Sequence, residues 1–292
     1  MVSLIQDGWI DSRSIRSIHL GTKVMMKRAI FLFMLALVFI ATVPYGLSAS
    51  TPAPMPAYFP LRFGSGERLT YEVTLNDAHV GKAVLEVLEK TKFAGRDAYH
   101  LVSRIKSNKW VSLFSRIDGQ VESYIDVEGG YSHRMKINKR RKKKEEAKTI
   151  DFDQVGHHAT EFKRGKEEVF DIPPKVQDFL SSLYYLRAQD RLEPGASVFI
   201  DLHQNGKNWQ VEVRVLEKER VTTPAGSFKT IKVHTSFPEG GLLKNGGDLI
   251  IWFTDDDKRV PVMMQSEGKK GLMIASLSSK KEGPLTPIAD DF

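Results

Sequence analysis

Residues 173–195 read PPKVQDFLSSLYYLRAQDRLEPG and form the one clearly helical segment in a chain otherwise rich in predicted strands. Apolar residues recur in it every three or four positions, which places them on one helical face. The two prolines suit the start of a helix, and Pro194 with Gly195 ends it. We therefore predict one helix from Val176 to Gln189, whose broad apolar face must be buried against a sheet.

Short segments on both sides of this helix alternate apolar and polar residues, which is the period of a half-buried strand. Turn sequences such as Asn205-Gly206 separate them, at the spacing of about 8–12 residues that is typical of sandwiches and barrels. Because the segments follow one another as hairpins, the sheet should be antiparallel. The predicted fold is mainly β: a curved antiparallel sheet or open barrel of about eleven strands, with the helix packed on it.

The N-terminus has the pattern of an export signal. Lys27 and Arg28 precede the apolar run AIFLFMLALVFIATV, residues 29–43, and small residues follow it. This order is typical of a cleaved signal peptide, and Met25 and Met26 lie where such a signal would begin. We divide the chain into a non-native extension (1–24), a signal peptide (25–49), a proline-rich linker (50–62), one β-rich domain (63–280) and a polar tail (281–292).

A cleaved signal peptide predicts a periplasmic protein. The alternative is an inner-membrane anchor formed by residues 29–43, but that run is shorter than the roughly 20 residues that a spanning helix needs. The chain contains no cysteine. Disulfides, thiolate metal sites, cysteine nucleophiles and lipid attachment through a cysteine are therefore excluded.

The charge of the chain argues against a nucleic-acid partner. The net charge of +7 falls to +4 when residues 1–50, which carry five cations and two acids, are left out. An exported and only mildly basic protein does not fit nucleic-acid binding.

Six consecutive cations lie between two predicted strands and cannot share a buried face. Two interpretations stay open. The run is either a solvated hairpin tip that protects a sheet edge from aggregation, or a patch that docks on an anionic membrane surface or lipopolysaccharide. The residues are Lys139, Arg140, Arg141, Lys142, Lys143 and Lys144.

No recognisable catalytic or metal-binding motif is present in the sequence. There is no HExxH, and the adjacent pair His157-His158 would point to opposite sides of a strand. No GxSxG surrounds any serine. We assign no catalytic residue, no metal and no cofactor.

Several motifs occur in a familiar order: GERLTYEV, VGKAVLEV, DFLSSLYYLR, LEPGASVFIDL, TPAGSFKTIKV, IWFTDDDKRVPVMM and GLMIASL. Together they resemble an exported bacterial family catalogued as domain of unknown function 3108, over about Gly66 to Leu277. The resemblance implies a curved, mostly antiparallel sheet in the cell envelope of Gram-negative bacteria. It implies no activity, because the family has no assigned reaction.

Our leading hypothesis is a non-enzymatic carrier or binding protein that holds a lipid or lipid-linked envelope component in an apolar groove between helix and sheet. One alternative is an enzyme that acts on envelope glycans or lipids, and another is a scaffold that binds an envelope protein along an open sheet edge. The expected partners are a lipid or an anionic membrane surface, and the sequence identifies no protein partner. The groove residues that we predict are Phe179, Leu183, Tyr184, Arg187 and Trp252.

Overall fold

The computed structural model of the chain describes residues 62–115, 118–141, 144–190, 192–237, 247–268 and 271–283. The predicted extension and signal peptide lie outside these residues, as do most of the linker and of the polar tail. Those divisions of the chain therefore stay predictions.

One antiparallel sheet accounts for most of the described chain, with 15 strands among the described residues. The strands run in the order β10-β11-β12-β13-β14-β15-β1-β2-β4-β5-β6-β7-β8-β9, with β3 beside β4. Their bounds are β1 (Arg68–Leu75), β2 (Ala78–Val87), β3 (Thr91–Phe93), β4 (Arg96–Ser107), β5 (Asp118–Asp126), β6 (Ser132–Arg141), β7 (Lys144–Asp153), β8 (His158–Lys163), β9 (Lys166–Asp171), β10 (Ser197–Gln204), β11 (Lys207–Thr223), β12 (Gly226–Phe237), β13 (Gly247–Thr254), β14 (Pro261–Gly268) and β15 (Gly271–Lys281).

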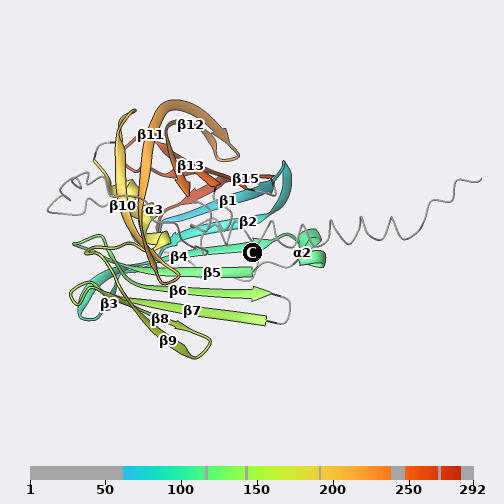
Figure 1. Cartoon of the computed structure of the whole chain (residues 1–292). Helices are drawn as coiled ribbons and strands as arrows, with labels where there is room; N and C mark the ends of the chain where they lie inside the picture. Colours follow the sequence, from blue (N-terminus) through green and yellow to red (C-terminus); the bar gives the residue numbers. More distant parts are fainter. Residues whose placement is uncertain are drawn as a thin grey trace, which may run out of the picture.

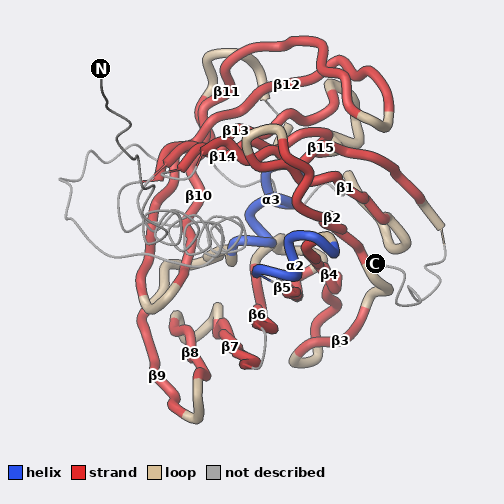
Figure 2. The backbone as a smooth tube through the Cα atoms, turned by 90° about the vertical axis from the view of Figure 1, so that its right-hand side faces the viewer, coloured by secondary structure: helices blue, strands red, loops and turns tan. Residues whose placement is uncertain are grey.

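The sheet curves strongly without closing, so that β10 and β9 are its two edges. Figure 1 shows the sheet twisting and bending from strand to strand, and Figure 2 shows its strands arranged as an incomplete ring. The prediction of a mainly β, curved antiparallel sheet is thus confirmed. The predicted number of strands is wrong, because the sheet has 15 and not eleven. β3, with three residues, is too short to show a period of two.

Helix α3 (Phe179–Ala188) is the predicted helix, but it begins three residues after Val176. Asp178 sets the start: its carboxylate accepts the backbone N–H of Leu180 and of Ser181, and its own N–H donates to the Ser181 hydroxyl. This reciprocal capping satisfies N–H groups that a helix start leaves unpaired. The helix ends before Gln189, whose backbone is extended.

A second helix, α2 (Lys109–Ser115), was not predicted. It connects β4 to β5, and the Asn108 side chain accepts the backbone N–H of Val111 at its first turn. Seven residues are too few to show a helical period clearly. Within the described ranges, neither helix is long and apolar enough to span a membrane.

The core lies inside the curve of the sheet, where α3 is packed as predicted. Leu180 and Tyr184 are buried, and Phe63 meets the Tyr184 ring edge-on with 4.8 Å between ring centroids. Figure 2 shows α3 within the ring of strands. The segment before α3 pairs with one open edge of the sheet, since Gln177 forms a parallel bridge with Leu202 of β10.

Candidate binding site

A cavity lies between α3 and the concave face of the sheet. Its volume is about 110 Å³, and its wall is almost entirely apolar. Helix α3 supplies one wall, and nine of the described strands supply the other. The lining residues are Tyr71, Ala83, Leu85, Ser103, Val121, Phe179, Leu180, Ser182, Leu183, Leu186, Ile200, Leu202, Val211, Val213, Val233, Thr235, Leu249, Ile251, Met264 and Ser266.

The first turn of α3 is fixed by buried hydrogen bonds to the sheet. Ser123 of β5 and Ser132 of β6 each donate a hydroxyl hydrogen bond of 2.5 Å to the Asp178 carboxylate. Asp178 has no exposed surface. Burial raises the pKa of its carboxyl group, and the surrounding donors act in the opposite direction. The start of α3 is therefore held against two strands by a fully enclosed polar cluster.

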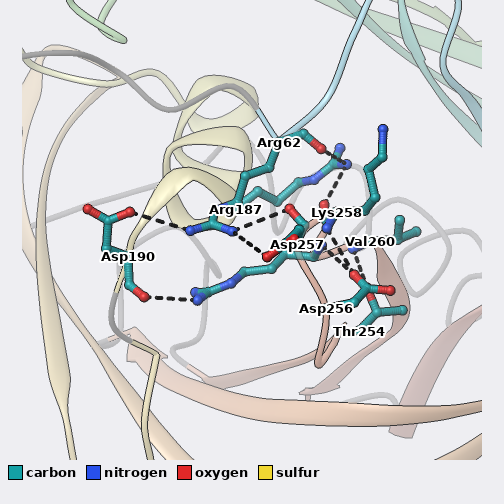
Figure 3. A network of polar contacts seen from close by, with 9 residues as sticks. Arg62, Arg187, Asp190, Thr254, Asp256, Asp257, Lys258 and Val260 are labelled. Atoms are coloured by element: carbon teal, nitrogen blue, oxygen red, sulfur yellow. Dashed lines mark hydrogen bonds and ion pairs between the residues drawn. The ribbon is translucent and has the colours of Figure 1, made fainter.

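The last turn of α3 is held by a buried ion pair. Arg187 Nη1 lies 2.6 Å from Glu67 Oε1 and Nη2 lies 2.9 Å from Glu67 Oε2, while Nη2 also donates to the Lys258 carbonyl at 3.1 Å. Burial alone would lower the pKa of Arg187, but its hydrogen bonds and ion pair with Glu67 raise it. Figure 3 shows Arg187 with Arg62 and Asp190 beside the turn that carries Lys258. This charged end of the molecule lies where β1 and β14 begin.

The predicted groove residues separate into three places. Phe179 and Leu183 line the cavity. Tyr184 and Arg187 face the charged end instead, with the Arg187 guanidinium 5.2 Å from the Tyr184 ring centroid. Trp252 lies apart from both, and its indole N–H donates to Glu219 at 2.6 Å. Successive residues of a helix point in directions about 100° apart around its axis. The apolar residues of α3 therefore cover two faces, and these faces have different surroundings.

One polar residue of the cavity wall, Thr235, was not among the predicted groove residues. Thr235 of β12 lines the cavity and is only 6% exposed, and within the described part of the chain its hydroxyl has no hydrogen-bond partner. Buried hydroxyls in folded proteins are normally paired. A threonine in an alternating strand gives no signal of this kind, because its surroundings come from strands distant in sequence.

A third polar cluster joins the two edge regions of the sheet. Lys148 of β7 and Glu161 of β8 form a buried ion pair of 2.8 Å, and Glu161 Oε1 accepts the backbone N–H of Gly206 in the turn between β10 and β11. Burial would raise the pKa of Glu161, but the nearby His203 ring, whose Nε2 lies 3.5 Å from Oε1, and the Lys148 charge hold it at about 2. This cluster, Lys148, Glu161, His203 and Gly206, is the seam between the edges.

The predicted basic run is only partly described. Lys139 is buried at 9% exposure, whereas Arg140 is exposed. The backbones of Arg141 and Lys144 pair with each other at the tip of the β6–β7 hairpin. Lys142 and Lys143 lie outside the described residues. Lys139 stands opposite Glu146 in the ladder, so one cation of the run is buried while its neighbour Arg140 faces outward, and the choice between hairpin tip and docking patch stays open.

Comparisons with known proteins support the fold. Residues 70–277 match the family described as "Protein of unknown function (DUF3108)". No curated protein is significantly similar to the sequence. A solved β-barrel-like protein of the domain of unknown function DUF1849 from Brucella abortus matches with a TM-score of 0.52 and 12% identity, covering 75% of this chain and 98% of its own.

Two further solved structures match with lower TM-scores. A putative exported protein with a YmcC-like fold from Bacteroides fragilis has a TM-score of 0.33 and 15% identity, over 77% of this chain and 99% of its own. The lipoprotein LppX from Mycobacterium tuberculosis has a TM-score of 0.25 and 12% identity, over 76% and 90%. The family match covers most of the sequence, and the chain belongs to the DUF3108 family.

Proposed function

We propose that this member of the DUF3108 family is a non-enzymatic binding or carrier protein of the cell envelope. It holds an alkyl chain of a lipid or of a lipid-linked molecule in the cavity between α3 and the sheet. The observation that carries the proposal is this cavity of about 110 Å³, lined by apolar side chains inside the core. Apolar cavities stay free of water and accept apolar ligands.

The size of the cavity bounds the ligand. A single buried water needs about 10–15 Å³ on the same scale, so the space holds on the order of ten such units. That suits part of one alkyl chain and not a whole phospholipid. The ligand is therefore a chain whose polar group stays outside the cavity or near its few hydroxyl-bearing residues, Ser103, Ser182, Thr235 and Ser266.

A cavity of this volume would be costly to leave without a ligand, which supports a functional role. At about 24 cal/mol per Å³, leaving the space unfilled costs roughly 2–3 kcal/mol. Domains are stable by only about 5–15 kcal/mol, so this cost is a large share. A ligand that fills the space would offset this cost in free energy. Fixed contacts at both ends of α3, at Asp178 and at Arg187, keep the helix from collapsing onto the sheet.

The proposed location is the periplasm, and the support for it is the signal-like pattern of residues 25–49. An envelope carrier meets lipids at a membrane surface, so the partners proposed here are a lipid ligand and the membrane or lipopolysaccharide layer that supplies it. Of the predicted groove residues, Phe179 and Leu183 are proposed to contact the alkyl chain.

Binding of a fluorescent long-chain fatty acid, cis-parinaric acid, tests the proposal. Ala83 lines the cavity, so Ala83→Leu places three more carbon atoms in it. Overpacking costs ~1–3 kcal/mol, and the affinity should fall by about tenfold or more. The matched control is Ala147→Leu, at an exposed position of β7, which should bind like wild type. Absence of binding by the wild type, or equal binding by Ala83→Leu, would contradict the proposal.

A further inference from the structure

The strand ends around α2 form one continuous rim of the sheet. Asp118, the first residue of β5, pairs with Lys106 near the end of β4 and with Arg140 near the end of β6. The α2 connection and the β6–β7 tip are therefore neighbours, and Figure 1 shows them at the same end of the molecule. The β1–β2 turn joins them, because the Asn108 side chain donates to the His79 carbonyl.

This rim carries a tryptophan in an unusual position. Trp110 of α2 is 77% exposed, while Val111 beside it is buried in the core. Val111 thus fixes the orientation of the helix and turns Trp110 outward. Tryptophan combines a large apolar ring with a polar N–H, and it is enriched where one side is apolar and the other wet, as at a membrane surface.

Two exposed cations lie on the same rim as this tryptophan. Lys109 precedes it and is exposed, and Arg140 is exposed on the neighbouring hairpin. The sequence from Lys139 to Glu146 holds six cations and two acids, and one of these acids, Glu146, is paired with Arg164 in the turn between β8 and β9. The rim is therefore positive beside an exposed indole, and this charge is complementary to anionic phospholipid headgroups.

We propose that this rim, defined by Lys109, Trp110 and Arg140, docks on an anionic phospholipid membrane. Trp110 enters the headgroup region, and the two cations contact lipid phosphates. A nucleic acid would use the cations without burying the indole between headgroups, and a protein partner would not require an anionic lipid. A wild type that ignores anionic vesicles would point to one of these two partners instead.

The rim also leads toward the cavity. Thr235, Leu249 and Ser266 line the cavity, and each lies two residues from the end of β12, β13 or β14 that belongs to this rim. The charged contacts of Arg187 lie at the opposite ends of β1, β13 and β14. An alkyl chain that leaves a membrane at the rim meets the cavity without crossing those charges. This last step rests on the proposed function, whereas docking itself does not.

Co-sedimentation with vesicles tests the docking surface. Wild type should bind vesicles that contain phosphatidylglycerol and not vesicles of phosphatidylcholine alone, and the bound fraction should fall as salt shortens the Debye length from about 10 Å at 0.1 M to about 3 Å at 1 M. Each cation near such a surface contributes about 1 kcal/mol, so Lys109→Gln with Arg140→Gln should weaken binding on the order of 25-fold. Trp110→Ala should weaken it further and remove the blue shift of tryptophan fluorescence on vesicle addition.

The matched control is Lys92→Gln with Lys175→Gln, two exposed lysines at the opposite end of the sheet, which should bind like wild type. The proposal is overturned if wild type ignores phosphatidylglycerol, if it binds neutral vesicles equally, or if the Lys109, Trp110 and Arg140 variants bind unchanged. Ala83→Leu separates the two proposals: it should dock normally while it loses the fatty acid. If wild type docks on vesicles but binds no fatty acid, the docking proposal stands and the proposed function of the cavity is contradicted.

Discussion

Helix α3 has two kinds of surroundings, and they differ in how completely they are filled. At its ends, Asp178 and Arg187 are wholly buried and make several short hydrogen bonds to the sheet and to Glu67. On the side that faces the sheet, Phe179, Leu183 and Leu186 line the cavity. A loosely packed helix would show gaps on all sides. The contrast teaches that the position of α3 is set by polar contacts, which leaves its apolar face available to a ligand.

The contrast has a physical basis. Charged groups inside a protein are costly unless they are paired in one geometry, so they fix the position of the elements that carry them. Apolar contacts are not directional and tolerate a ligand in place of protein atoms. The seam at Lys148 and Glu161 repeats the arrangement at the sheet edges. The polar clusters at the two ends of α3 thus fix the helix beside a space that apolar packing alone would tend to close.

The largest expected effect comes from the charged end of α3. Arg187→Leu leaves the Glu67 carboxylate buried without its partner, and breaking a buried pair costs about 3–5 kcal/mol. Urea unfolding should show this loss in the free energy of unfolding. The double variant Arg187→Leu with Glu67→Leu removes both charges and should recover a large part of it. A single variant that unfolds at the wild-type urea concentration would show that this ion pair does not anchor the helix.

The seam should give an effect of intermediate size that depends on pH. The pKa of Glu161 is held at about 2, below its ordinary value of 4.5, so the folded state favours the ionised form. The stability from this group is therefore present above pH 4.5 and is lost as the pH falls toward 2. At neutral pH, Glu161→Gln weakens hydrogen bonds to a charged group, which are worth about 1.5–3 kcal/mol.

The melting temperatures of wild type and Glu161→Gln should therefore converge as the pH is lowered through that window. Glu145→Gln is a suitable control, because Glu145 is exposed on β7 and should contribute little at any pH. A gap between wild type and Glu161→Gln that stays constant from neutral to acid pH would show that the seam does not depend on the Glu161 charge.

Sequence patterns predicted the helix and the sheet because both leave local periodic signals. The sequence also contains the N-cap pattern of α3, since Asp178 is followed three residues later by Ser181. The predicted helix nevertheless begins at Val176, before this cap, because Val176 fits the apolar period. The cavity left no such signal. Val233 and Leu249 read as ordinary inward residues of strands, and whether space remains between them and Leu183 depends on elements that are distant in sequence.

The same limit explains the mixed outcome for individual residues. Tyr184 and Leu183 are adjacent and apolar, yet one packs against Phe63 and the other lines the cavity. Trp110 gave no signal either, because exposure depends on the orientation of a short helix. Periodicity identifies which residues face inward, and only the packed structure shows what they face.

The smallest expected effect is also the sharpest test of the contrast between filled and unfilled surroundings. Thr235 and Thr230 are both buried on β12, but Thr230 donates its hydroxyl hydrogen bond to the Glu219 carbonyl at 2.8 Å, whereas among the described residues the Thr235 hydroxyl has no partner. A buried unpaired hydroxyl costs about 1–3 kcal/mol, while a paired one contributes about 1 kcal/mol. Thr235→Val should therefore raise the melting temperature, and Thr230→Val should lower it. Differential scanning calorimetry of the ligand-free proteins measures both. If the two variants lose stability alike, the Thr235 hydroxyl has a hydrogen-bond partner, and the contrast fails at this position. If instead Thr235→Val gains stability but binds a hydroxylated fatty acid less tightly than wild type, the Thr235 hydroxyl contacts the polar group of the ligand.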